Sequence, residues 1–163
     1  MVKLQTNFGE ITLELNAEKA PITTANFLQY VDNGFYDGVI FHRVIDGFMI
    51  QGGGFDTAMN QKESAAEIKN EADNGLANDQ YTIAMARTSA PHSASSQFFI
   101  NVGNNEFLNH TAPTSSGWGY CVFGKVTAGM DVIDKIKLVK TTSRKGHQDV
   151  PVDNVIIERA TRC

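Results

Sequence analysis

Hydrophobic and polar positions alternate along much of this chain, with the period that half-buried β-strands show. Alternation is clear over residues 2–8 and again over 11–15, so these segments predict a hairpin that turns near residues 7–10. Short apolar or alternating runs, bounded by turn residues, predict the remaining strands. These are expected at residues 39–45, 48–51, 81–86, 96–102, 120–126 and 155–157.

Two segments follow helical spacing instead. Pro21 suits the first position of a helix, and apolar residues then recur at helical spacing until Gly34, which predicts the end. A second helix is predicted from about Gly129 to Lys137, because apolar residues recur there at every third position. Polar segments with few regularly spaced apolar residues predict surface loops at residues 56–78, 109–119 and 139–151.

The order of these elements favours one mainly β domain over residues 1–163. Seven or eight strands and two helices are expected, without the regular strand–helix alternation of a parallel sheet. This pattern predicts an antiparallel barrel or sandwich that carries two helices. The chain is long enough for a substantial core, and it contains no internal repeat, low-complexity segment or domain linker.

Composition and charge narrow the classes of function. A hydrophobic share of 42% and a charged share of 20% are ordinary for a soluble globular protein. The net charge of −4 argues against general binding of nucleic acid, which requires a basic surface. No apolar run approaches the roughly 18 residues of a membrane span, so no membrane partner is expected.

The expected location is the cytoplasm. The first residues enter the strand pattern directly, without the basic head and apolar segment of a secretory signal. The two cysteines are Cys121, within an apolar strand pattern, and Cys163, the last residue. Two such thiols do not form a disulfide framework and fit a reducing compartment. No feature indicates oligomerisation, so a monomer is expected.

Candidate chemistry is concentrated in one segment, FHRVIDGFMIQGGGF, at residues 41–55. Arginine is rare in an apolar strand unless its charge is needed there, because burying it unpaired is costly. Alternation places Phe41, Arg43 and Ile45 on one face of the strand. A cation beside an apolar hollow, with an amide nearby, suits a mostly apolar substrate whose own amide is to be polarised. A bend at residues 46–47 would bring further side chains to the same opening, namely Phe48, Met49 and Gln51.

The segment SQFFIN at residues 96–101 is a second candidate for the lining of a binding cleft. Alternation puts Gln97, Phe99 and Asn101 on one face, whereas the opposite face is wholly apolar and fits the core. The mixed face either lines a cleft or is a partly solvated face of a barrel strand, and the pattern leaves both open. Tyr120, in a later strand pattern, likewise suits either a ligand wall or a core tyrosine with a satisfied hydroxyl.

Five motifs run in order along nearly the whole chain: FHRVIDGFMIQGGG, MAR, SSQFFIN, GYCVFGKV and GMDVIDKI. Together they resemble the cyclophilin family, and most of all its short cytosolic bacterial members. The resemblance implies a closed eight-stranded antiparallel β-barrel capped by two α-helices. It also implies peptidyl-prolyl cis-trans isomerase activity on proline-containing peptides and on unfolded or folding proteins, with no metal or organic cofactor.

The same resemblance implies roles residue by residue. Arg43 matches the family's catalytic arginine, and Gln51 and Gln97 match amides of its substrate cleft. Arg87 lies on the edge that holds the substrate backbone, where the family usually has asparagine, so it would act through its main-chain groups. The same edge includes Ala86 and Thr88. The walls of the family's proline pocket are matched by Phe48, Met49, Phe99 and Leu108.

Two positions depart from the family pattern. Phe107 stands where a pocket tryptophan is common, and Trp118, the only tryptophan, is not its equivalent. Tyr120 replaces the pocket histidine of many members. Both changes keep an aromatic wall, so proline binding should persist. Phe107 lacks the indole N–H of tryptophan, so only weak binding of cyclosporin, the family's drug ligand, is predicted.

Other enzyme classes find less support in the sequence. Ser95, Ser96 and His92 lie close together, but the G-x-S-x-G turn of many serine hydrolases is absent. No two of the four histidines have short metal-ligand spacing and no CxxC occurs, so no metal site is expected. His42 is expected to be a hydrogen-bonded core residue. The glycines at residues 52–54 predict a turn rather than a phosphate loop, because no G-K-[ST] follows them.

The alternative from a different class is a non-catalytic protein that uses the same cleft, either a proline-peptide binding module or a holdase chaperone. Arg43 favours the enzyme, because a pure binder has no need for a cation at the prolyl nitrogen. A lipocalin-like ligand barrel would need a hollow interior. The inward positions Phe98, Ile100 and Phe123 are large enough to fill it.

Overall fold

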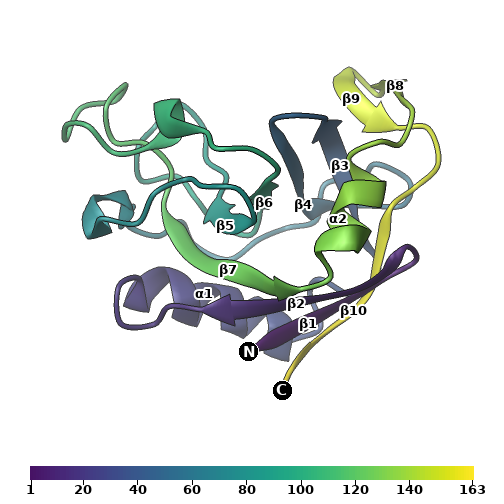
Figure 1. Cartoon of the computed structure of the whole chain (residues 1–163), viewed down its shortest axis with the longest axis horizontal. Helices are drawn as coiled ribbons and strands as arrows, with labels where there is room; N and C mark the ends of the chain where they lie inside the picture. Colours follow the sequence, from purple (N-terminus) through teal and green to yellow (C-terminus); the bar gives the residue numbers. More distant parts are fainter.

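The chain folds into ten β-strands and two α-helices, and the computed structural model describes every residue from 1 to 163 (Figure 1). The helices are α1 (Pro21–Asp32) and α2 (Met130–Ile136), and two single-turn 3-10 helices are η1 (Ala72–Asn74) and η2 (Glu106–Leu108). The strands are β1 (Val2–Thr6), β2 (Gly9–Leu15), β3 (Val39–Ile45), β4 (Met49–Asp56), β5 (Thr82–Met85), β6 (Phe98–Asn101), β7 (Val122–Ala128), β8 (Thr141–Arg144), β9 (His147–Pro151) and β10 (Ile156–Arg162).

Eight of the strands close into an antiparallel barrel in the order β1-β10-β3-β4-β6-β5-β7-β2, which confirms the predicted fold class. Both helices lie near their predicted bounds and contribute to the barrel core, Phe27 from α1 and Ile133 from α2. Figure 1 shows the two helices well apart on the barrel. No helix combines the length and the apolar character of a membrane span.

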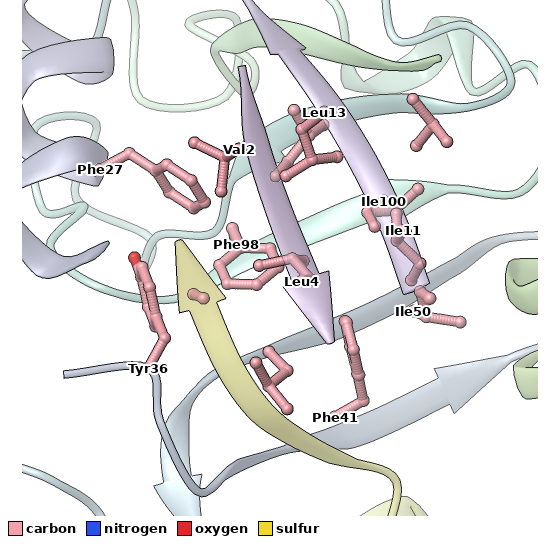
Figure 2. Packing of buried hydrophobic residues seen from close by; sticks show 14 of the residues in the cluster. Val2, Leu4, Ile11, Leu13, Phe27, Tyr36, Phe41, Ile50, Phe98 and Ile100 are labelled. Carbon is pink, nitrogen blue, oxygen red and sulfur yellow. The ribbon is translucent and has the colours of Figure 1, made fainter. Parts of the chain in front are cut away.

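Large side chains fill the interior of the barrel. The ring of Phe27 lies 5.5 Å from that of Phe98 and 5.2 Å from that of Phe123. Aliphatic side chains of β1 and β2, including Leu4 and Leu13, are fully buried in the same cluster (Figure 2). A close-packed interior leaves no room for a ligand. The lipocalin-like alternative therefore lacks the hollow it needs, and any binding site lies on the outside of the barrel.

A bulge in β3 decides which side chains face outward. Phe41 pairs with Gly52 and Arg43 pairs with Gln51, so His42 is an extra residue on β3 without a partner on β4. Such a bulge shifts the alternation of the strand by one position. Phe41 is fully buried in the barrel core, whereas Arg43 is exposed. The prediction that Phe41 and Arg43 share a face is therefore wrong.

Glycines 52–54 lie inside β4 and not in the predicted turn. A Cβ at Gly52 would lie 2.8 Å from the carbonyl oxygen of Ile40, and one at Gly54 would lie 2.6 Å from Cγ of Gln97. Real side chains are not found at such distances. These glycines therefore allow β4 to pass close to β3 and to the Gln97 side chain.

The predicted loop at residues 139–151 contains β8 and β9, which form a separate two-stranded sheet. The sequence did not reveal this hairpin because most of its side chains are exposed, so no alternation marks it. Val150 is its buried anchor and packs with Ile40, Phe55 and Met59. The hairpin is thereby fixed to the barrel beside β3 (Figure 1).

The predicted loop at residues 56–78 contains no strand after the end of β4 and is tied to α1 by Glu71. Helix α1 has no capping side chain of its own at Ala20. One carboxylate oxygen of Glu71 accepts hydrogen bonds from the main-chain N–H and the hydroxyl of Thr23, at 2.7 and 2.8 Å. Its other oxygen accepts the N–H of Ile22 at 3.3 Å. A distant residue thus satisfies the free N–H groups that every helix start presents.

Replacement of Glu71 by alanine should lower the free energy of unfolding by about 0.5–2 kcal/mol, the range measured for lost helix caps. Urea denaturation would measure the change. Glu18→Ala is the matched control, because Glu18 is exposed and forms no ion pair. Equal stability of the two variants would show that the contact does not cap α1.

Candidate functional site

A hollow of about 140 Å³ lies on the outer wall of the barrel, over β3, β4 and β6 and beyond the end of β5. Its apolar walls belong to a cluster separate from the barrel core, which includes Met49, Phe99 and Leu108. The structure therefore brings together most residues that the sequence predicts for the site. The lining consists of Arg43, Phe48, Met49, Gln51, Ala86, Arg87, Phe99, Leu108 and Tyr120.

Arg43 is the only cation in the hollow whose guanidinium is not engaged by the protein. Its side chain is exposed and takes part in none of the three ion pairs. It also has no hydrogen-bond partner within the protein, although Gln51 is its neighbour across the strands. Arginine stays protonated in proteins and carries five N–H donors, so all of these remain available to a bound molecule.

Gln51 connects this hollow with a second, polar hollow of about 280 Å³. Its side-chain N–H donates a hydrogen bond of 3.0 Å to the side-chain oxygen of Gln97. The side-chain oxygen of Gln51 and the amide group of Gln97 keep hydrogen-bonding capacity for a ligand. Two predicted site residues, Thr88 and Gln97, line the second hollow rather than the first.

Arg87 forms the border opposite Arg43. Its Nε donates to the carbonyl oxygen of Gly119 at 2.9 Å, and its guanidinium carbon lies 4.7 Å from the centre of the Tyr120 ring. The cation thereby fixes the tyrosine as a wall of the hollow, so the alternative of a core tyrosine is excluded. The main-chain N–H and C=O of Arg87 have no partner in the protein. They are therefore free to pair with the backbone of a substrate, which is the role that the sequence predicts for this residue.

A chain of buried asparagines supports the hollow from behind. Asn105 donates to the carbonyl oxygen of Phe48 at 2.9 Å and to the side chain of Asn101 at 2.8 Å. Asn101 donates to Asn78 at 3.1 Å, and Asn78 donates to the carbonyl oxygen of Tyr120 at 3.3 Å. Sequence analysis missed this network. The available signal was Asn101 itself, because asparagine is uncommon in strands.

Phe107 is the one predicted wall residue that lines neither hollow. It is 75% exposed, and its ring lies 5.6 Å from that of Phe48 at the rim. The neighbouring Leu108 is 92% buried and faces the hollow. The two residues share the short turn η2, so the inward position of Leu108 leaves Phe107 pointing outward.

His42, the extra residue of the bulge, is buried beside Arg43. Its ring lies 4.4 Å from that of Phe55 and 6.2 Å from that of His147. The prediction that His42 is buried is confirmed, whereas the predicted hydrogen bond is wrong, because Nδ1 has no partner. Burial lowers the pKa of His42 to about 4, and the charges of His147 and Arg43 act in the same direction. The imidazole is therefore neutral at pH 7.

The site offers no activated serine. Nδ1 of His92 accepts the main-chain N–H of Asn70 at 3.0 Å, and the Ser95 hydroxyl accepts a hydrogen bond from Ser64. No three His, Cys, Asp or Glu side chains are arranged to hold a metal ion. The arrangement instead offers an apolar hollow bordered by a cation, an amide and free main-chain groups.

Comparison with known proteins gives a consistent result. The family model for cyclophilin-type peptidyl-prolyl cis-trans isomerases matches residues 1–162. Peptidyl-prolyl cis-trans isomerase cyp18 of Streptomyces antibioticus is 65% identical over 159 residues, covering 98% of this chain and 96% of that protein. Peptidyl-prolyl cis-trans isomerase B of Escherichia coli is 58% identical over 161 residues, covering 99% and 98%.

The fold agrees with these sequence comparisons. A crystal structure of a cyclophilin-type isomerase of Cryptosporidium parvum, determined in the presence of the dipeptide Ala-Pro, matches with a TM-score of 0.78. The identity is 29%, and the match covers 98% of this chain and 96% of that one. The sequence motifs, the family model and the fold thus all indicate the same family.

The low pKa of His42 predicts a pH-dependent stability. The unfolded state binds a proton near the ordinary value of 6.5, whereas the folded state resists protonation until about pH 4. The stability that the neutral His42 contributes is therefore fully present above pH 6.5 and is lost as the pH falls toward 4. The total loss in the free energy of unfolding is roughly 3 kcal/mol. Urea denaturation at pH 7 and 4.5 should show a loss about 2 kcal/mol smaller in His42→Gln than in the parent protein. Parallel losses would contradict the assignment.

Proposed function

This chain belongs to the cyclophilin-type family of peptidyl-prolyl cis-trans isomerases, and we propose that Arg43 is its catalytic residue. The observation that carries the proposal is a guanidinium without a protein partner at the border of an apolar hollow. The reaction is rotation about Xaa-Pro peptide bonds. The hollow holds the proline ring, and Arg43 acts on the bond that rotates.

The chemistry explains why a cation is useful here. Resonance gives the peptide bond a rotation barrier of about 18–20 kcal/mol. As the bond twists, the resonance is lost and the prolyl nitrogen gains a lone pair. An N–H of Arg43 that donates to this nitrogen stabilises the twisted state more than the planar one, which is the condition for catalysis.

The remaining groups hold the substrate while the bond turns. Phe48, Met49 and Phe99 enclose the ring of proline, so the segment on one side of the bond is fixed. The free main-chain groups of Arg87 pair with the substrate backbone on the other side of the hollow. Holding both parts in the geometry of the twisted state lowers the entropic part of the barrier.

The proposed substrates are exposed Xaa-Pro segments of peptides and of unfolded or folding proteins. The hollow lies on the outer wall of the barrel, so a bound polypeptide can continue beyond it in both directions. Cys121 and Cys163 are free thiols, which supports a location in the cytoplasm. A monomer satisfies this proposal, because one chain supplies every residue of the hollow.

Replacement of Arg43 by alanine should reduce kcat/KM for an Ala-Pro peptide about ten- to a hundredfold. This range follows from the roughly 1.5–3 kcal/mol that a hydrogen bond to a charged group contributes. The rate of isomerisation would be measured by NMR exchange or in a coupled protease assay.

Arg159→Ala is the matched control, because Arg159 is an exposed arginine on β10 that pairs with Gln5 of β1 and does not line the hollow. This control should retain full activity. Equal activity of Arg43→Ala and the control would remove Arg43 from the mechanism. Peptide binding without isomerisation in the parent protein would instead favour the holdase alternative.

Weak inhibition by cyclosporin is a further expectation. Phe107 offers an apolar ring at the rim but no N–H donor. One neutral hydrogen bond contributes about 0.5–1.5 kcal/mol, so Phe107→Trp should tighten cyclosporin binding roughly two- to tenfold. Inhibition constants of the two proteins would be compared. Nanomolar inhibition of the parent protein would contradict the inference.

A further inference from the structure

One buried asparagine joins three loops behind the proline hollow. Asn70 lies in the loop at residues 56–78, and its side chain is shielded from solvent. The side-chain amide donates hydrogen bonds to the carbonyl oxygens of Pro91 and Gly119, at 3.1 and 3.0 Å. Pro91 belongs to the loop between β5 and β6, and Gly119 belongs to the segment that leads into β7. No role discussed above uses this side chain.

The carbonyl oxygen of Gly119 is shared between Asn70 and Arg87. Nε of Arg87 donates to it at 2.9 Å, beside the donor from Asn70. A carbonyl oxygen has two lone pairs, so both are occupied. Gly119 has a φ of 74°, and a Cβ there would lie 2.6 Å from the carbonyl oxygen of Leu108. Because glycine has no side chain to anchor it, the two hydrogen bonds to its oxygen hold this peptide group in place.

The same peptide group leads into Tyr120. The N–H on its other side belongs to Tyr120 and donates to the carbonyl oxygen of Leu108 at 2.9 Å. A peptide group is planar, so contacts to its oxygen also fix the direction of this N–H. The ring of Tyr120 then lies 4.7 Å from the guanidinium carbon of Arg87. Asn70 therefore lies behind two residues that line the hollow, although it does not line the hollow itself.

A second path connects Asn70 with the same segment through aromatic rings. The main-chain N–H of Asn70 donates to Nδ1 of His92 at 3.0 Å. The ring of His92 meets that of Trp118 edge to face, with 4.9 Å between the ring centres. His110 packs against Trp118 at the same distance. Trp118 directly precedes Gly119 in the chain, so Asn70 holds this segment from two sides.

We propose that Asn70 is a positioning residue of the isomerase site. It touches no substrate, and it acts through the peptide group of Gly119 to hold Arg87 and Tyr120 where they meet the substrate. The inference rests on the proposed function, in which Arg87 pairs with the substrate backbone. Arg43 has no contact with this network, because it makes no hydrogen bond or ion pair within the protein. Loss of the Asn70 amide should therefore weaken substrate binding and leave the rotation step intact.

Replacement of Asn70 by alanine should raise KM for an Ala-Pro peptide about two- to tenfold, the effect of one net hydrogen bond. The value of kcat should stay within about twofold, because binding of the planar and twisted states is weakened equally. Isomerisation measured by NMR exchange over a range of peptide concentrations gives both constants. Asn70→Ser is a second variant that should show the same split. Its hydroxyl oxygen can keep the turn to the N–H of Ala72, but it lacks the amide donors.

A double-mutant cycle with Arg87 separates positioning from a general structural role. Arg87→Ala should itself raise KM, because the ring of Tyr120 and the Gly119 carbonyl both lose a partner. If Asn70 acts through Arg87, adding Asn70→Ala to this variant should raise KM by less than about twofold more. Two independent effects would instead multiply in full.

Asn74→Ala is the matched control, because Asn74 makes the same kinds of contact from the same loop. Its side-chain oxygen accepts the N–H of Leu76, two residues on, and its amide donates to the carbonyl oxygen of Val122 at 3.1 Å. It does not contact Gly119. This variant should keep both KM and kcat of the parent protein, and urea denaturation would verify that all variants are folded.

Three results would overturn the proposal: an equal rise of KM in Asn74→Ala, full multiplication of the effects of Asn70→Ala and Arg87→Ala, or a fall in kcat at unchanged KM in both Asn70 variants. Failure of the proposed function would be seen elsewhere. Full activity of Arg43→Ala would remove the mechanism at the rotating bond. The comparison of Asn70 with Asn74 would still stand, since it depends on KM.

Discussion

The bulge at His42 is the constraint on which the site depends. The barrel interior is filled by rings such as Phe27 and Phe98, so it cannot hold a substrate. A regular β3 would carry Arg43 on the same face as the buried Phe41. The extra residue shifts the alternation, and the guanidinium reaches the outer wall beside Gln51. The closed barrel thus provides a rigid wall, and the bulge in β3 places the guanidinium of Arg43 on the outer face of that wall.

The hollow beside this cation is held by polar contacts from elements far apart in sequence. Asn105 and Asn78 fix the carbonyl groups of Phe48 and Tyr120, and Arg87 fixes the ring of Tyr120. Buried amides that are fully hydrogen-bonded specify one arrangement, because each unpaired group would be costly. Arg43 is the exception, since it keeps its donors free. The walls are therefore rigid, and the group that we propose acts on the rotating bond is the one left unpaired.

Much of this architecture could be predicted from the sequence, because it depends on local period. Alternation over residues 2–15 gave the first hairpin, and the motif around Arg43 indicated the family and its fold. Features that depend on pairing between strands could not be predicted. The bulge is defined only against Gly52 on the neighbouring strand, and the β8–β9 hairpin is too exposed to show alternation. Phe107 points outward because Leu108 takes the inward position, which one sequence cannot reveal.

The most direct test of the account is an NMR titration that follows the backbone amides on addition of an Ala-Pro peptide. The account places substrate on the outer wall, between Arg43 and Arg87 and across Gln51. It predicts the largest shifts at these positions and little change in β1 and β2, which lie beyond β10 or β7 in strand order. Shifts concentrated in β1 and β2, with none at Arg43, would contradict it.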